Sequence, residues 1–417
     1  MIRSRIYVFS LSILAASILA ACAQMEPVQR VESTSTLRPT ETVEANDPFL
    51  ICKSVSEIPV SECKTLVSFY LHTSGDHWMN NEERYKNVWL ETSTPCSWAG
   101  ILCENGHVTE ISLGLNGLSG EIPPQIGDLT YLTSLDLSDN HLTNVPPEIG
   151  SLTNLSRLNL AFNDLSSLPV ELGKLTPLTA LYLAGNGLES LPPIGNLTNL
   201  TELYLGYNSL NSVPHEIGNL TKLTILDLRE NNLRTLPTEI GALSNLEHLC
   251  LPDNHLTSLP VEIYELTNLI ELDLSRNKLS DLPSEIRNLT NLEYLYLFGN
   301  DLDNLPPEIG DLAHLSQLNL EGNKLTSLPP EIGKLTQLQI LFLSNNNLSN
   351  VPAEIGNSTS LVILYLNGNQ LSDLPPELAN LTNISELFLT DTNLSTLSPQ
   401  LCAVFSEVVA PPSLCTP

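Results

Sequence analysis

The stretch LEYLYLFGNDLDNLPPEIGDLAH, residues 292–314, is one complete copy of a pattern that fills most of this 417-residue chain. Its first half has the form Leu-x-x-Leu-x-Leu-x-x-Asn-x-Leu, and its second half reads Leu-Pro-Pro-Glu-Ile-Gly. A period near 23 residues indicates a repeat architecture, in which each unit packs against its neighbours. The copies begin at Val108, Leu132, Leu155, Leu178, Leu200, Leu223, Leu246, Leu269, Leu292, Leu315, Leu338, Leu361 and Ile384.

The first half of each copy alternates apolar and polar residues, as in LYL at 203–205 and LDL at 272–274. This alternation predicts a short strand with its leucines pointing inward. Because 23 residues are too few for a strand and a full crossover helix, each copy forms one coil and successive strands pair in parallel. Prolines such as Pro237 and Pro260 block strand pairing in the second half, so we expect that side to be irregular or briefly helical.

The ninth position is Asn in every copy except the last, where it is Thr392. An amide side chain both donates and accepts hydrogen bonds, so we expect it to satisfy backbone groups of neighbouring coils. The asparagines are Asn116, Asn140, Asn163, Asn186, Asn208, Asn231, Asn254, Asn277, Asn300, Asn323, Asn346 and Asn369.

Over residues 108–397 these motifs resemble the leucine-rich-repeat superfamily. The resemblance implies an α/β solenoid of about thirteen repeats, a horseshoe with a parallel β-sheet on its concave face and an irregular or short-helical convex face. The 23-residue copies look like the Ras-group repeats of intracellular scaffolds, whereas Leu118–Pro123 looks like the plant extracellular type. The segment 96–103, together with Trp78 and Trp89, resembles the N-terminal cap of plant-type receptors.

The N-terminus has the features of an export signal, with two arginines before an apolar run too short for a membrane span. Its end, Leu19-Ala-Ala-Cys22, resembles the bacterial lipobox, which implies cleavage after residue 21 and a lipid on Cys22. An ordinary signal peptide is the alternative. Residues 22–47 are rich in Ser, Thr, Pro and Glu, which predicts a disordered tether. We therefore expect an exported protein, lipid-anchored to the bacterial cell envelope and facing outside or the periplasm.

Six of the eight cysteines form close pairs near the ends of the repeats. An oxidising compartment permits disulfides there, namely Cys52–Cys63, Cys96–Cys103 and Cys402–Cys415. The end coils of a solenoid need covering, so residues 48–107 and 398–417 are expected to form N- and C-terminal caps.

Acidic residues outnumber basic residues 47 to 18, giving a formal charge of −29. Such a chain should repel nucleic acid and anionic membranes, so membrane contact is expected only through the lipid and partners are expected to be basic or neutral. The sequence contains no Gly-rich phosphate loop, no His-Glu-x-x-His and no Gly-x-Ser-x-Gly motif. We predict no enzymatic activity and no cofactor.

Counted from the first residue of each repeat, the third, fifth and seventh positions lie on or beside the strand and point away from the core. Aromatic residues gather at these and adjoining positions, and exposed aromatic clusters usually mark binding sites. The plainer interpretation is that bulky residues favour strands. The predicted ligand-binding residues are Tyr182, Tyr204, Tyr207, Tyr294, Tyr296, Phe298, Phe342, Tyr365 and Phe388.

A second cluster is expected around His248 and Cys250, which lie on one strand between Asp227 and Asp273 on the neighbouring strands. Thiolate, imidazole and carboxylate groups are ligands for zinc. An acidic surface with one thiol is the interpretation we favour, so no metal site is predicted.

Together these features predict a surface-anchored, non-enzymatic module that binds a protein, peptide or glycan on its concave face. An intracellular-type signalling scaffold and a purely structural or adhesive envelope protein are the alternatives.

Overall fold

The computed structural model describes residues 47–79, 89–406 and 408–415. The predicted signal, Cys22 and most of the tether lie outside these residues. The chain forms two compact units, the first ending at Ser209 and the second beginning at Leu210. The repeat pattern, which runs through this point without interruption, does not predict the division.

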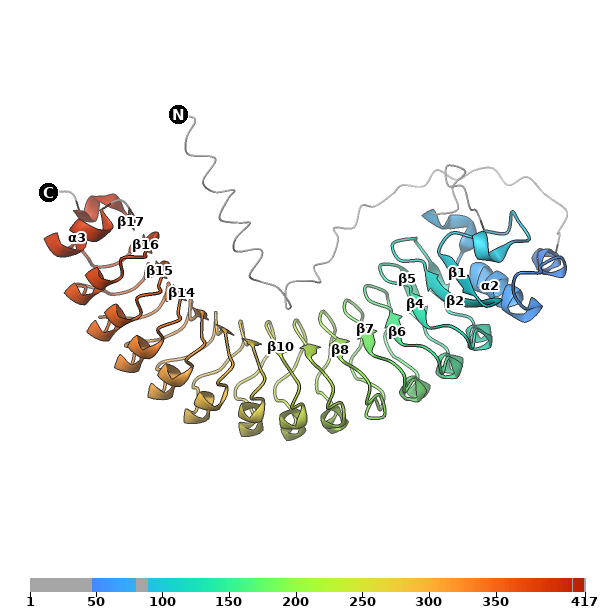
Figure 1. Cartoon of the computed structure of the whole chain (residues 1–417), viewed down its shortest axis with the longest axis horizontal. Helices are drawn as coiled ribbons and strands as arrows, with labels where there is room; N and C mark the ends of the chain where they lie inside the picture. The colour runs from blue at the N-terminus through green and yellow to red at the C-terminus, as the bar shows by residue number, and fades with distance from the viewer. Residues whose placement is uncertain (1–46, 80–88, 407, 416–417) are drawn as a thin grey trace, which may run out of the picture. The chain divides into compact units, whose positions relative to one another are not determined.

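The first unit contains the elements that precede the repeats, together with the first repeats (Figure 1). Its main sheet has the order β1-β2-β4-β6-β7-β8, in which β1 and β2 are antiparallel and the later neighbours are parallel. The elements are η1 (Pro48–Lys53), α2 (Val60–His72), η2 (Gly75–His77), η4 (Pro95–Ser97), β1 (Ile101–Glu104), β2 (His107–Ser112), β3 (Ser119–Glu121), η5 (Pro124–Asp128), β4 (Ser134–Asp136), β5 (His141–Asn144), η6 (Pro147–Ser151), β6 (Arg157–Asn159), η7 (Val170–Lys174), β7 (Ala180–Tyr182) and β8 (Glu202–Tyr204).

The second unit contains the remaining repeats and the C-terminal segment, with parallel strands in the order β9 to β17. Its elements are η8 (His215–Asn219), β9 (Ile225–Asp227), η9 (Thr238–Ala242), β10 (His248–Cys250), η10 (Val261–Glu265), β11 (Glu271–Asp273), η11 (Ser284–Asn288), β12 (Tyr294–Tyr296), η12 (Pro307–Asp311), β13 (Gln317–Asn319), η13 (Pro330–Lys334), β14 (Ile340–Phe342), η14 (Ala353–Asn357), β15 (Ile363–Tyr365), η15 (Pro376–Asn380), β16 (Glu386–Phe388), α3 (Pro399–Phe405), β17 (Val409–Ala410) and η16 (Pro412–Cys415).

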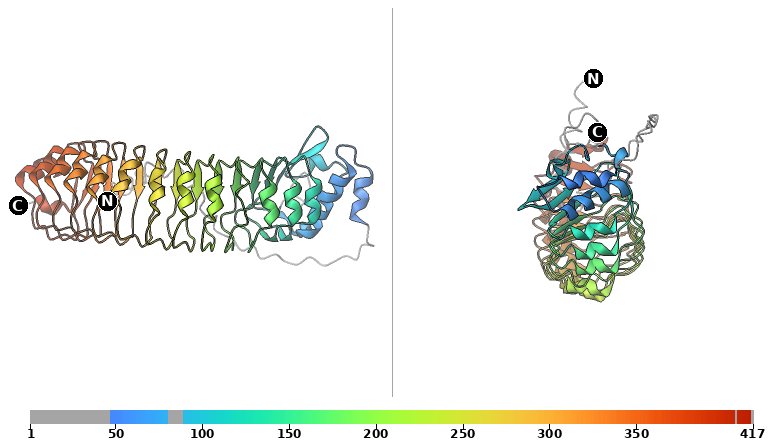
Figure 2. Two further views of the ribbon diagram at one scale, coloured as in Figure 1. Left: turned by 90° about the horizontal axis from the view of Figure 1, so that it is seen from below. Right: turned by 90° about the vertical axis from the view of Figure 1, so that its right-hand side faces the viewer.

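Each regular coil has a three-residue strand on one side and a 3₁₀ turn on the other (Figures 1 and 2). The strands pair residue for residue one repeat apart, for example Leu272 with Leu295, and both leucines are fully buried. The leucine-rich-repeat solenoid predicted from the sequence is confirmed, with a parallel sheet and a short-helical opposite side within each unit. The 22-residue copy differs, because residues 188–199 form no 3₁₀ turn.

The buried asparagines link neighbouring coils as predicted. Asn277 donates from Nδ2 to the carbonyls of Leu274 (3.1 Å) and Leu251 (2.9 Å), and its Oδ1 accepts from the backbone N–H of Leu256 (3.0 Å). The same arrangement recurs along the second unit, for instance at Asn323. In the last copy Thr392 bonds only within its own coil among the hydrogen bonds described, through Oγ1 to the Leu389 carbonyl at 2.8 Å.

The residue before each asparagine position has a left-handed backbone in all thirteen copies, a feature that the repeat alignment did not predict. Glycine fills this place in four copies, including Gly368, whereas Leu115 and Arg276 are among the residues that adopt a positive φ without being glycine. This conformation turns the chain out of the strand, and non-glycine residues adopt it at a cost in free energy.

The three predicted disulfides are present, joining Cys52 to Cys63, Cys96 to Cys103 and Cys402 to Cys415. Before the first repeat, Trp78, Trp89 and Trp98 form a buried aromatic cluster. The buried Glu62 of α2 accepts from the Val108 backbone N–H at 2.8 Å and pairs with His107 at 2.6 Å, which fixes this helix to the first repeat strand.

The 3₁₀ turns pack closely against one another through glycine. A Cβ on Gly310 of η12 would lie 2.4 Å from the Glu331 carbonyl of the next turn, and one on Gly241 would lie 2.5 Å from that of Glu262. Real Cβ atoms do not approach this closely, so the glycine of Pro-Pro-Glu-Ile-Gly sets the spacing of the turns. Among the described residues, no helix has both the length and the apolar character needed to cross a bilayer.

Candidate ligand-binding surface

The side chains at the third, fifth and seventh positions of the repeats form a surface that we call the sheet face. In the second unit three of its aromatic side chains lie on adjacent strands, because β14, β15 and β16 pair in register at Phe342, Tyr365 and Phe388. The ring centroids are 5.0 Å apart for Phe342 and Tyr365 and 4.5 Å apart for Tyr365 and Phe388, both edge-to-face. We call these three residues the aromatic ladder.

The ladder is partly exposed and has both apolar and polar neighbours. Ile340 and Ile363 are aligned beside it on the same strands. The Tyr365 hydroxyl donates to Glu386 Oε2 at 2.8 Å. Burial and this hydrogen bond both raise the pKa of Tyr365. The ladder therefore offers apolar ring surface edged by a carboxylate.

Other predicted aromatic residues do not join the ladder. Tyr294, Tyr296 and Phe298 are on or just after β12, and β13, which carries Gln317 and Asn319 in the paired positions, separates them from Phe342. Phe298 lies under the Arg276 guanidinium, 5.2 Å from it. Tyr296 is buried and its hydroxyl has no hydrogen-bond partner among the described residues.

In the first unit Tyr182 and Tyr204 stack at 5.0 Å with nearly parallel rings. Arg157 lies 4.4 Å from the Tyr182 ring centroid on the preceding strand, and the Tyr182 hydroxyl donates to Glu202 Oε2 at 2.5 Å. Tyr207 instead neighbours Phe162, at 6.4 Å. Burial, followed by the bond to Glu202, raises the pKa of Tyr182.

The prediction that these aromatic side chains are exposed is wrong for Tyr182, Tyr204 and Tyr296, which are buried. Strands about 4.8 Å apart let a planar ring cover its neighbour, and Tyr182 lies between Arg157 and Tyr204. Sequence reasoning missed Arg157, Glu202 and Glu386 as partners of these rings. All three occupy the third position of their repeats. A comparison of the residues at the third position with the aromatic residues at the fifth position of neighbouring repeats would have found them.

Carboxylates occupy the sheet face between the start of the second unit and β12. Asp227 forms an ion pair with Arg229 at 2.9 Å, and Glu271 Oε2 lies 3.0 Å from His248 Nδ1. The second oxygen of Glu271, Oε1, is buried and has no hydrogen-bond partner among the described residues. Burial raises the pKa of Asp273 to about 6, and the nearby charge of Glu271 adds to this shift.

The alternative of a metal at His248 and Cys250 gains no support from this geometry. Asp227 and Asp273 do flank Cys250 on β9 and β11, as predicted. However, Asp227 is occupied by Arg229 and His248 by Glu271. The expectation of a thiol on this surface is wrong, because Cys250 is fully buried and is not a free cysteine. No group of three or more His, Cys, Asp or Glu side chains in the described ranges is arranged to hold a metal ion.

Comparison with known proteins agrees with this architecture. The chain belongs to the leucine-rich-repeat family: the leucine-rich repeat region family matches residues 182–281 and 283–403, and a second leucine-rich repeat family matches residues 130–188. A probable inactive receptor kinase, RLK902, of Arabidopsis thaliana is 46% identical over 55 residues, which are 13% of this chain and 8% of that protein. Because the match covers so little of that protein, its kinase name says nothing about this chain's activity.

Solved structures share the fold over longer stretches. The Leptospira interrogans leucine-rich-repeat protein LIC12759 has a TM-score of 0.62 at 38% identity, covering 72% of this chain and 83% of that one. The PEPR1–AtPEP1 structure has a TM-score of 0.57 at 30% identity, covering 81% and 55%. The Arabidopsis HAESA ectodomain, solved with an IDA peptide hormone ligand, has a TM-score of 0.58 at 26% identity, covering 81% and 65%. The fold therefore resembles ligand-binding ectodomains of peptide hormone receptors.

Proposed function

We propose that this protein is a non-enzymatic binding module that takes an extended peptide, or an extended segment of a protein, on the sheet face of its second unit. The observation that carries the proposal is the aromatic ladder of Phe342, Tyr365 and Phe388. Partly exposed aromatic clusters are typical binding hot spots. The peptide ligand in the HAESA structure supports this class of partner.

The charges of the sheet face favour a basic residue in the ligand. Glu271 is almost fully buried beside His248, so its carboxylate acts on a ligand through its charge and not by direct contact, and this charge favours a ligand ammonium or guanidinium. Asp273 lies on the same strand, and the chain as a whole is strongly acidic. Between β11 and the ladder strands β14 to β16 there are three to five strand spacings, or roughly 14–24 Å. An extended peptide covers that distance in about four to seven residues.

A random heptapeptide-to-dodecapeptide display library tests the proposal directly. We expect selection on the purified protein to enrich peptides that combine Lys or Arg with apolar residues. Tyr365→Ala should weaken a selected synthetic peptide at least about tenfold, as expected for a hot-spot side chain. Leu364 beside it points into the core and stays unchanged, so the variant should remain folded.

The matched control is Tyr131→Ala, which changes an exposed tyrosine of the first unit and should leave peptide affinity unchanged. Failure to enrich any peptide, or equal affinity for the wild type and the Tyr365→Ala and Phe342→Ala variants, would favour the structural or adhesive alternative. Glu271→Gln should weaken basic peptides selectively, because the amide keeps the size of the side chain and loses its charge.

We also propose that the protein is exported and anchored to the bacterial envelope. In this proposal residues 1–21 are the signal, Cys22 carries the lipid, residues 22–47 are the tether, and residues 48–107 and 398–417 cap the repeats at 108–397. The three disulfides support an oxidising compartment. Cys22→Ser should move the protein from the membrane fraction to the soluble exported fraction. A cytoplasmic wild-type protein with reduced cysteines would instead favour an intracellular scaffold.

A further inference from the structure

Three carboxylates gather on neighbouring strands of the sheet face of the second unit. Asp227 of β9 and Asp273 of β11 both pair with Cys250 of β10, which places them two strand spacings apart, or roughly 10 Å. Glu271 lies two residues before Asp273 on β11, so both side chains point to the same face. We call Asp227, Glu271 and Asp273 the carboxylate cluster. Asp227 and Glu271 are almost fully buried and Asp273 is partly exposed, so Asp273 is the member that a bound ligand meets.

The carboxylate cluster has few positive partners. Asp227 pairs with Arg229 at 2.9 Å, and Glu271 lies 3.0 Å from His248 of β10. In the described ranges Asp273 forms no ion pair, and it accepts a hydrogen bond from the backbone of the residue two places on. The carboxylates therefore outnumber the one guanidinium, and the cluster is anionic at neutral pH.

The other groups that face the cluster do not change this balance. On β12, Tyr294 and Tyr296 carry no charge at neutral or acidic pH. Just after the strands, Arg276 pairs with Asp253 at 3.7 Å, and Glu230 adds a further negative charge.

Mild acid removes negative charge from the cluster. A carboxylate that is withdrawn from water beside another carboxylate takes up a proton more readily than one in water. Burial raises the pKa of Asp273 to about 6 despite hydrogen bonds from Ser275, and the charge of Glu271 adds to this shift. Protonation of His248 would act in the same direction, since histidine changes its charge near physiological pH.

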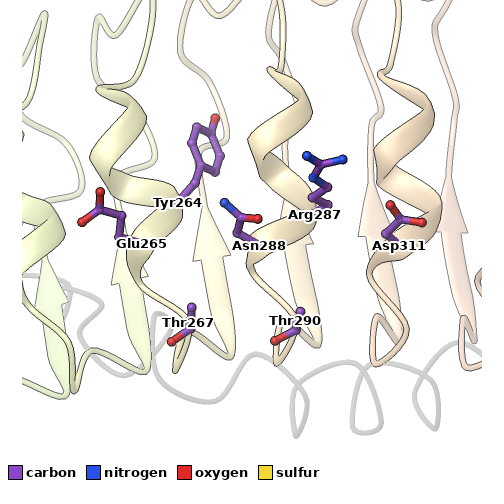
Figure 3. A pocket seen from close by; sticks show the side chains of 7 residues that line it. All are labelled: Tyr264, Glu265, Thr267, Arg287, Asn288, Thr290 and Asp311. Carbon is purple, nitrogen blue, oxygen red and sulfur yellow. The ribbon is translucent and has the colours of Figure 1, made fainter.

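The turn side of the same unit offers a comparison. Figure 3 shows Glu265, Arg287 and Asp311 on three consecutive turns, η10, η11 and η12, and all three are exposed. Water and salt screen exposed charges from one another. Asp311 therefore provides a carboxylate of this unit that lies outside the sheet face.

We propose that the carboxylate cluster makes ligand binding depend on pH, so that the sheet face binds a basic peptide at neutral pH and releases it in mild acid. This inference rests on the proposed function, because it requires a basic ligand on the sheet face. An ionised Asp273 attracts a ligand ammonium or guanidinium, and a protonated Asp273 does not.

The test is the dissociation constant of a selected peptide at pH 7.5, 6.0 and 5.0 and at constant ionic strength. The peptide has blocked termini and contains Lys or Arg but no Asp, Glu or His, so that it does not titrate in this range. We expect the wild-type dissociation constant to rise about three- to tenfold between pH 7.5 and pH 5.0. Asp273→Asn should bind at pH 7.5 about as weakly as the wild type does at pH 5.0, and its affinity should depend on pH much less.

The matched control is Asp311→Asn, which removes the same charge outside the sheet face and should keep the wild-type response to pH. A wild-type affinity that is equal at pH 7.5 and pH 5.0 overturns the inference and leaves the proposed function intact, whereas a library that yields no peptide overturns both. A pH response that is retained by Asp273→Asn and lost by His248→Gln overturns the assignment to Asp273.

Melting temperatures separate release from acid unfolding and need no peptide. Because the pKa of Asp273 is raised above its ordinary value of 3.8 to about 6, the folded protein takes up a proton in this range before the unfolded chain does. Protonation therefore stabilises the fold, and lowering the pH from 7.5 to 5.0 should raise the melting temperature of the wild type relative to that of Asp273→Asn. A relative fall would show that ionised Asp273 stabilises the fold, which contradicts the switch.

Discussion

At the residue scale, the buried asparagines are the clearest case in which one side chain joins two coils. Asn277 makes four hydrogen bonds to backbone groups, two of them to the preceding coil. Its replacement by alanine leaves buried donors and acceptors unpaired, at about 1–3 kcal/mol for each lost partner. We expect Asn277→Ala to lower the free energy of unfolding by roughly 2–4 kcal/mol, measured by chemical denaturation.

The control for this prediction is Asn291→Ala. Asn291 donates one exposed hydrogen bond, from Nδ2 to the Thr267 carbonyl at 2.9 Å. Water can replace a partner at an exposed site, so the loss should stay below about 1 kcal/mol. Equal effects of the two substitutions would show that burial of the asparagine ladder is not what stabilises the stack.

At the left-handed position before each asparagine, replacement of a non-glycine residue by glycine is expected to stabilise the fold. Leu115 has a φ of 53° and is more than half exposed, so its side chain contributes little packing. Because glycine adopts this conformation without steric cost, Leu115→Gly should raise the free energy of unfolding by about 0.5–1 kcal/mol. The rise should appear as an increased denaturant midpoint.

The reverse substitution provides the contrast. Gly368 has a φ of 68°, and a Cβ there would lie 2.4 Å from Oδ1 of Asn345. Gly368→Ala should therefore lower the midpoint, since strain and a steric contact act together. A higher midpoint for Gly368→Ala would refute the assignment of strain to this position.

At the scale of the elements, much of the coil was predictable from the sequence. The alternation around residues 272–274 predicted the strand, and the 23-residue period predicted the register that pairs Leu272 with Leu295. Both follow from local spacing. The exposure of Tyr182 was not predictable, because it depends on Arg157 and Tyr204 from other strands covering one ring. The close packing of the 3₁₀ turns was not predicted, because Gly310 meets the Glu331 carbonyl of the next turn only in three dimensions.

Short loops closed by disulfides are expected to stabilise the two terminal segments. The Cys52–Cys63 and Cys402–Cys415 disulfides span 11 and 13 residues at opposite ends of the chain. A disulfide that closes a loop of this size contributes about 2–4 kcal/mol to the free energy of unfolding. We expect reduction to lower the melting temperature and to accelerate hydrogen exchange first in α2 and α3. Unchanged melting after complete reduction would contradict this role.

At the scale of the whole molecule, each unit has a parallel sheet on one side and 3₁₀ turns on the other, and the candidate peptide site of the second unit lies on its sheet face. The sheet face carries the aromatic ladder and the carboxylates of β11. The sequence repeat determines the backbone conformation of each coil. Function depends on the few positions at which a coil departs from its neighbours.

The central claim is that the aromatic ladder of the sheet face binds the peptide ligand. Hydroxyl-radical footprinting, read by mass spectrometry with and without a saturating selected peptide, measures the accessibility of aromatic side chains directly. We predict strong protection of Phe342, Tyr365 and Phe388, with oxidation of the exposed Tyr131 unchanged. Protection confined to other surfaces, or none at these three rings while the peptide is bound, would contradict the claim.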